Sequence, residues 1–140
     1  MNDPMDQETW EYITMIDDKL VDELIREMQT PMGMVEEFRE TAGQKRDPDM
    51  AASLIVEEYH ELIGEDSGRC SAELKELADL VYVCFGYANS KNWDLDEALR
   101  RVHENNMGRM YQDDGTIKYN EDGKVIKNPM YPKVDLGDLV

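Results

Sequence analysis

Four acidic residues lie where the amphipathic pattern of two expected helices predicts apolar side chains. Glu58 and Glu61 belong to the first helix, and Glu76 and Asp79 belong to the next. Each pair is spaced three residues apart, so its two carboxylates point from one helical face. Four ionised carboxylates buried there without a cation would cost on the order of 10 kcal/mol, which matches the whole stability of many domains. Because the stretch 50–64 contains no lysine or arginine, we expect a divalent metal to compensate them.

The expected ligands are all oxygen atoms, which suits Mg²⁺ or Mn²⁺. Glu57 directly precedes the first pair and is expected either to join the ligands or to act as the base that positions a water. With His60 it forms E-x-x-H, which is half of a di-iron carboxylate signature. The next helix offers Glu76-x-x-Asp79 instead of a second E-x-x-H. A di-iron oxidase is therefore the weaker interpretation, and His60 is expected at the surface or in an interface.

Five helices are expected to position these residues. Apolar side chains at helical spacing predict helices over about 9–28, 32–41, 48–64, 71–88 and 95–107. Asp47-Pro48 is an N-cap followed by proline at the first helical position, and Asp94 with Glu97 forms a capping box. The third and fourth helices are joined by a short loop. We therefore expect them to be antiparallel neighbours, with the two acid pairs facing each other across one groove.

The chain changes character after the last expected helix. Residues 116–127 alternate and turn at Asp122-Gly123, which predicts a small hairpin, and the prolines at 129 and 132 predict extended chain. The expected fold class is all-α: an antiparallel bundle of about five helices with a small C-terminal hairpin or extended tail. We expect three parts, namely a helical extension at 1–30, a helical catalytic core at 31–112 and the tail at 113–140.

Composition restricts the possible partners. The chain has 140 residues, of which 41% are hydrophobic and 34% are charged, and its formal net charge is −17. We expect such a chain to repel nucleic acids and anionic membranes, whereas a phosphate-bearing ligand stays possible where metal ions screen it. The first ten residues are acidic and polar, and no apolar run nears the roughly 20 residues of a membrane span, so we expect a cytoplasmic protein. Cys70 and Cys84 form no metal-binding or redox motif.

Polar and basic residues near the C-terminal end are candidates for binding a phosphate, with a solvated surface as the alternative. They are Asn106, Arg109, Lys124 and Lys127. Phe38 and Tyr131 could stack on a nucleobase, although aromatic residues more often serve packing.

The paired acidic motif resembles that of a known group of enzymes. Glu57-Glu58-Tyr59-His60-Glu61, followed by Glu76-Leu77-Ala78-Asp79, is similar to the E-E-x-x-E…E-x-x-D motif of the all-α nucleoside triphosphate pyrophosphohydrolases. This group includes MazG-like proteins, dimeric dUTPases, dCTP pyrophosphatases and phosphoribosyl-ATP pyrophosphohydrolases. Segments 35–43, 102–109 and 122–132 also resemble stretches of phage and bacterial MazG-like and HisE-like proteins, so the resemblance covers roughly residues 31–135.

The resemblance implies a hydrolase that cleaves a (d)NTP between its α- and β-phosphates, giving (d)NMP and pyrophosphate with the help of Mg²⁺. It implies as metal ligands Glu58, Glu61, Glu76 and Asp79. The implied catalytic residues are Glu57, Glu58 and Glu61, and the implied nucleotide contacts are Asn106, Arg109, Lys124 and Lys127. Because members of this group assemble as dimers or tetramers, the resemblance also implies a homo-oligomer.

Two further functions stay open from the sequence. One is hydrolysis of phosphoribosyl-ATP, to which the resemblance of the tail points. The other is a non-catalytic metal- or nucleotide-binding helical module that regulates a partner. Nucleotide binding without turnover would identify the module, and comparing phosphoribosyl-ATP with dGTP as substrate would separate the two enzymes.

Overall fold

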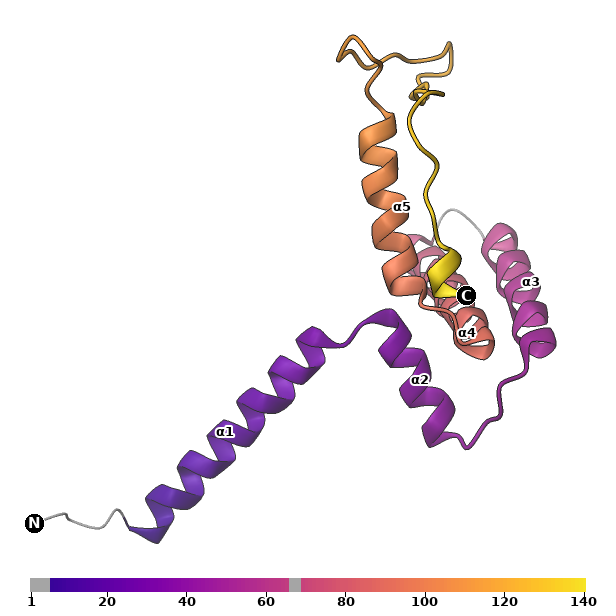
Figure 1. The fold of residues 1–140 in the computed structure, drawn as a ribbon. Coiled ribbons are helices and arrows are strands. Elements are labelled where there is room, and N and C mark those ends of the chain that lie inside the picture. The colour runs from indigo at the N-terminus through magenta and orange to yellow at the C-terminus, as the bar shows by residue number, and fades with distance from the viewer. Residues whose placement is uncertain (1–5, 66–68) are drawn as a thin grey trace, which may run out of the picture. The chain divides into compact units, whose positions relative to one another are not determined.

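The computed structural model of the chain describes residues 6–65 and 69–140. The chain divides into two units, Met1–Thr30 and Pro31–Val140. The regular elements of the described residues are all helical, and no β-strand forms there, so the all-α class is confirmed (Figure 1). The elements are α1 (Gln7–Met28), α2 (Pro31–Thr41), α3 (Pro48–Gly64), α4 (Cys70–Lys91), α5 (Leu95–Arg109) and the 3₁₀-helix η1 (Gly137–Leu139).

Aspartate caps determine where three of the helices begin. The side chains of Asp6, Asp47 and Asp94 accept the backbone N–H three residues later, at 2.7, 3.0 and 3.0 Å. The end of α4 lies later than the predicted position 88. It falls at Lys91, because Asn92 adopts the left-handed conformation with φ 59° and its N–H turns back to the last carbonyls of the helix.

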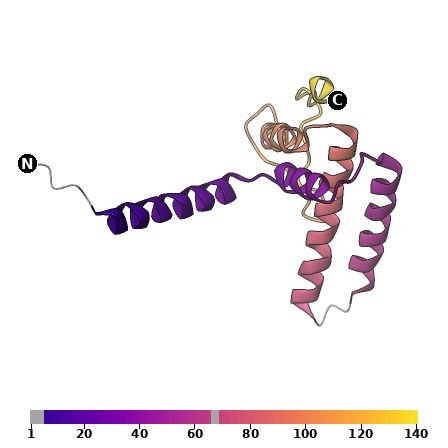
Figure 2. The same ribbon diagram turned by 90° about the horizontal axis from the view of Figure 1, so that it is seen from below.

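The helices α3 and α4 lie side by side and run in opposite directions, as the short loop between them predicted (Figure 2). α2 packs against α4, and α5 packs against α2 and η1. The buried apolar side chains come from α2, α3 and α4, and they are Val35, Ala51, Phe85 and Ala88. Leu77 and Val81 of α4 are 46% and 47% exposed, so α4 keeps an apolar stripe that is half exposed in the single chain.

The tail contains two turns and no regular strand within its described residues. Isolated antiparallel bridges pair Tyr111 with Ile117 and Tyr119 with Val125. The second bridge encloses the predicted turn at Asp122-Gly123, but one bridge is shorter than the hairpin that the alternation suggested. The first turn was not predicted. Each turn contains a glycine with positive φ, 80° in the first and 77° in the second, a conformation that other residues adopt only with strain.

The end of the tail is fixed to α5. Arg101 donates two hydrogen bonds to the Asp138 carboxylate at 2.6 and 2.8 Å, and the side-chain amide of Asn105 donates to the carbonyl of Pro132 at 2.8 Å. The ring of Tyr131 lies so close to Gly108 that a Cβ there would be 2.3 Å from it, so this contact requires glycine. No described helix is long and apolar enough to cross a membrane.

Candidate metal centre and nucleotide site

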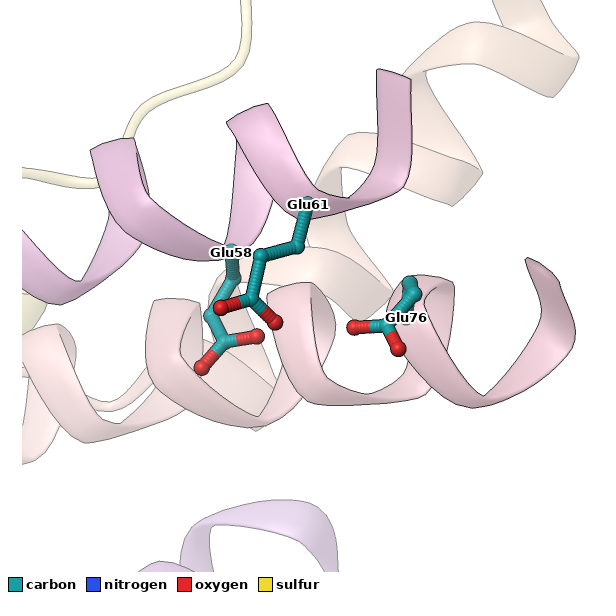
Figure 3. Close-up of side chains that lie close together, drawn as sticks. All are labelled: Glu58, Glu61 and Glu76. Carbon is teal, nitrogen blue, oxygen red and sulfur yellow. The ribbon is translucent and has the colours of Figure 1, made fainter. Parts of the chain in front are cut away.

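Three acidic side chains converge between α3 and α4. Glu58 and Glu61 come from neighbouring turns of α3, and Glu76 of α4 points toward them (Figure 3). One carboxylate oxygen of each residue lies within 4.8 Å of the other two. Their spacing along α3 puts both glutamates on the face that α4 covers. Three of the four predicted metal ligands therefore form one group, which we call the acidic cluster.

The acidic cluster is short of hydrogen-bond donors. Glu76 is 9% exposed, and Oε2 of Glu58 and Oε2 of Glu76 are buried with no hydrogen-bond partner in the described part of the chain. The charge of Glu58, a hydrogen bond with Glu76 and desolvation together raise the pKa of Glu61. A hard divalent cation would satisfy the unpaired oxygens and offset the repulsion. These residues therefore fit an oxygen-ligated Mg²⁺ or Mn²⁺.

Asp79, the fourth predicted ligand, is ion-paired with a lysine. Lys75 Nζ lies 2.8 Å from Asp79 Oδ2 and 3.3 Å from Glu76 Oε1. These hydrogen bonds, the one to Asp79 first, raise the pKa of Lys75. Lys75 was not predicted as a partner of these acids, because it lies outside the stretch 50–64, whose lack of cations suggested a metal. The i, i+4 spacing of Lys75 and Asp79 was the available signal.

Two other polar residues of the α3 motif are exposed. Glu57 is exposed, and its charge contributes to the raised pKa of Glu61, so it acts on the acidic cluster without belonging to it. His60 is exposed as predicted, with its ring 5.7 Å from that of Tyr59.

A cavity of about 110 Å³ lies among α2, α3 and α4. Leu54 lines it one turn before Glu58, and Tyr82 lines it one turn after Asp79, so the cavity continues along the two helices that carry the acids. The rings of Phe38 and Tyr82 meet edge to face there, with their centroids 6.2 Å apart. Phe38, a predicted base contact, thus lies at an apolar cavity next to the acidic cluster.

A hydrogen-bonded network closes the other end of the cavity. Asn89 is 6% exposed, and its side-chain oxygen accepts from Arg39 Nε at 3.0 Å and from Arg46 Nη1 at 3.4 Å. Its amide donates to Glu36, and Arg46 also donates to its backbone carbonyl. The hydrogen bonds from Arg39 and Asn89 lower the pKa of Glu36 to about 2. This network was not predicted, although Glu36 and Arg39 have the i, i+3 spacing of a helical ion pair.

The predicted phosphate contacts gather at the C-terminal end of α5. Lys127 Nζ donates to Asn106 Oδ1 at 2.8 Å, and Nε of Arg109 is buried with no partner among residues 6–65 and 69–140. Lys124 is exposed at the second turn of the tail, and Tyr131 packs on α5. This end of α5 projects away from the α3–α4 pair (Figure 1). The single chain therefore does not bring these residues to the acidic cluster.

A known protein family matches most of the helical part of the chain. The model of the family described as phosphoribosyl-ATP pyrophosphohydrolase matches residues 19–106. This span includes α2, α3 and α4, with the acidic cluster and the cavity, and most of α5. No curated protein matches the chain.

Proposed function

Because the chain belongs to the phosphoribosyl-ATP pyrophosphohydrolase family, we propose that it is a Mg²⁺-dependent hydrolase that cleaves a (d)NTP into (d)NMP and pyrophosphate. The observation that carries the proposal is the acidic cluster of Glu58, Glu61 and Glu76. Its unpaired, partly buried oxygens have no use in a purely structural helix pair, where they would be destabilising. They have a use if a cation and a triphosphate bind there.

In the proposed site, the acidic cluster holds Mg²⁺, which supplies positive charge to the phosphate oxygens when bound. Asp79 would be the fourth ligand, in competition with its ion pair to Lys75. Lys75 is then available to a phosphate oxygen. Glu57 orients the attacking water and accepts its proton. The water oxygen forms a new bond to one of the two phosphorus atoms that the α–β bridge joins. The bond between that phosphorus and the bridging oxygen breaks, and the bridging oxygen leaves with the other phosphorus as part of the second product.

The nucleoside end of the substrate is proposed to lie in the cavity that follows the acidic cluster along α3 and α4. Phe38 and Tyr82 offer aromatic surface to a base there. The mostly apolar lining excludes water from one side of the ring. The proposed catalytic core is thus 31–112, with the tail 113–140 as a source of further contacts and 1–30 as an extension.

A homo-oligomer, dimer or tetramer, is part of the proposal. Leu77 and Val81 leave an exposed apolar stripe on α4, which a second copy could cover. Five of the fifteen basic residues lie in 109–140, whereas the rest of the chain carries most of the acids. A second copy could therefore bring Arg109 and Lys127 to phosphates bound at the acidic cluster of the first.

The direct test is turnover by the purified protein across a panel of NTPs and dNTPs with Mg²⁺ or Mn²⁺, read as pyrophosphate release. We expect release with at least one nucleotide, and a loss of at least about 100-fold in the Glu58→Gln variant. No release across the panel would remove the (d)NTP proposal. Nucleotide binding without any turnover would favour the regulatory module instead.

Phosphoribosyl-ATP is the second candidate substrate, and it belongs in the same panel. The observation that favours it is the pair of guanidinium groups, Arg39 and Arg46, at the end of the cavity away from the acidic cluster. Turnover of phosphoribosyl-ATP well above that of ATP would replace the first proposal with this one.

A further inference from the structure

The loop between α2 and α3 forms the end of the cavity away from the acidic cluster. Lys45, Arg46 and Asp47 of this loop line the cavity there. Two hydrogen bonds attach the loop to α2. Nη1 of Arg39 donates to the carbonyl of Gln44 at 3.2 Å, and the N–H of Gln44 donates to the carbonyl of Arg39 at 3.0 Å. The loop therefore presents its side chains to the cavity from a fixed backbone.

The positive and negative groups of this loop are not paired with each other. No ion pair joins Asp47 to Lys45 or Arg46 in the described part of the chain, and Lys45 has no partner there. Arg46 is held by hydrogen bonds from Nη1 to Asn89 and from Nη2 to Glu36, which leave its Nε free within the described ranges. Asp47 caps α3 through Oδ1, which leaves Oδ2. Donors and an acceptor are thus available side by side.

We propose that this end of the cavity selects a guanine base, with Lys45 and Arg46 facing its O6 and N7 atoms and Asp47 facing its N1–H and amino group. The inference rests on the proposed function, which places the triphosphate at the acidic cluster and the base in the cavity. Guanine offers two adjacent acceptors, for which lysine and arginine are the usual partners, beside two adjacent donors that suit a carboxylate. In adenine an amino group replaces O6 and would point at the cations.

The distance along α3 favours a purine over a pyrimidine. Asp47 precedes Glu58 by eleven positions, or about 16 Å at 1.5 Å per residue. A base must therefore extend well away from the metal-bound phosphates to meet the loop, and two fused rings extend further from the sugar than one. Apolar side chains between the two ends, such as Leu54 and Val83, contact a ring without forming hydrogen bonds, so they do not distinguish one purine from another. Base selection thus depends on the loop.

Calorimetric binding of GMP, IMP, AMP and CMP in the presence of Mg²⁺ tests the selection without requiring turnover. IMP lacks only the amino group that Asp47 would accept from, and AMP has an amino group in place of O6. We expect the wild-type chain to bind GMP at least about fivefold more tightly than IMP, and IMP at least about fivefold more tightly than AMP, which is the size of effect that partly exposed polar contacts give. CMP, with a single ring, should bind more weakly than GMP.

Two loop variants assign the contacts. Asp47→Asn keeps the cap, because the amide oxygen of asparagine also accepts a backbone N–H at a helix start. Its amide nitrogen is then left facing the donors of the base, so the preference for GMP over IMP should disappear. Lys45→Gln should instead reduce the preference for IMP over AMP and keep that for GMP over IMP.

The matched control is Asp49→Asn, which makes the same charge change in the exposed first turn of α3 but outside the cavity lining. It should keep every preference, and circular dichroism confirms that the three variants fold. Equal affinity of the wild type for GMP, IMP and AMP would overturn the selection. So would affinity for CMP equal to that for GMP, binding of none of the nucleotides, or equal effects of Asp47→Asn and Asp49→Asn.

The outcome is separable from that of the proposed function. Hydrolysis of NTPs with no preference for guanine would keep the enzyme and reject the selection. Preferential binding of GMP without hydrolysis of any NTP would keep the selection and reject the enzyme. A guanine preference would also count against phosphoribosyl-ATP as the substrate, because its base is an adenine.

Discussion

The ammonium group of Lys75 lies 2.8 Å from the carboxylate of Asp79, on the helix that also supplies Glu76 to the acidic cluster. The pair is local, because the two residues are one turn apart on α4. It occupies the side chain that would complete a set of four metal ligands. The apo protein therefore contains an internal competitor for the proposed cation, because the Lys75 ammonium group already holds one oxygen of that carboxylate.

Removing that competitor should strengthen metal binding. We expect Lys75→Gln to bind Mg²⁺ about two- to fivefold more tightly, because Asp79 no longer has to leave an exposed ion pair of modest strength. Calorimetric titration of Mg²⁺ into the apo protein measures the change. Lys118→Gln, which removes a positive charge far along the chain in the tail, is the control for net charge. Affinity that falls or stays constant in Lys75→Gln would contradict a competition between Lys75 and the cation for Asp79.

The repulsion inside the acidic cluster predicts an unusual response to a conservative substitution. Glu58→Gln removes one charge from three carboxylates that lie within 4.8 Å of one another, so the apo protein should become more stable by about 1 kcal/mol. In a thermal melt with chelator, we expect the variant to have a higher midpoint than the wild type. Added Mg²⁺ should raise the midpoint of the wild type and have little effect on the variant. A fall in the apo midpoint would instead indicate that Glu58 has a structural role.

The ion pair between Glu36 and Arg39 predicts a dependence of stability on pH. The pKa of Glu36 is about 2 in the folded chain and ordinarily 4.5, so its contribution is present above pH 4.5 and is lost as the pH falls toward 2. Glu36→Gln should lower the free energy of unfolding at pH 7 by about 1–2 kcal/mol, allowing for solvent screening. The difference from wild type should shrink at pH 3. Urea unfolding at both pH values measures it, with exposed Glu121→Gln as the control. A difference that does not change with pH would contradict this account.

Local patterns in the sequence predicted the helices. They did not predict contacts between residues that are far apart in the sequence. Asp47 and Asp94 mark helix starts because a cap is a contact over three residues. The convergence of Glu58 and Glu76 followed from helical spacing and a short loop. By contrast, the hydrogen bond from Arg39 to Asn89 joins residues 50 positions apart, and no local pattern predicts it.

In the tail, too, a local feature could be predicted and a long-range contact could not. The turn at Asp122-Gly123 could be predicted, because glycine permits the positive φ that the turn needs. The position of the tail along α5 could not, because it depends on single contacts such as Arg101 with Asp138. Nor could spacing reveal that Arg109 and Lys127 lie apart from the acids in one chain. That separation depends on the direction in which α5 leaves the bundle.

If a second copy supplies the tail cations, two inactive variants that each lack a different part of the site should complement each other in a mixed oligomer. We expect the Glu58→Gln chain and the Arg109→Gln/Lys127→Gln chain each to have little activity alone. After joint refolding, half of randomly formed dimers are mixed, and each mixed dimer has one intact site of two, so about a quarter of the wild-type activity should return. Mixing Glu58→Gln with Glu76→Gln is the matched control: both changes affect the acidic half of the site, so every site in a mixed dimer stays damaged and no recovery is expected. Sedimentation establishes that mixed oligomers form. If they form and activity does not return in the first mixture, the cations and the acids of one site belong to the same chain, or the cations have no part in the site.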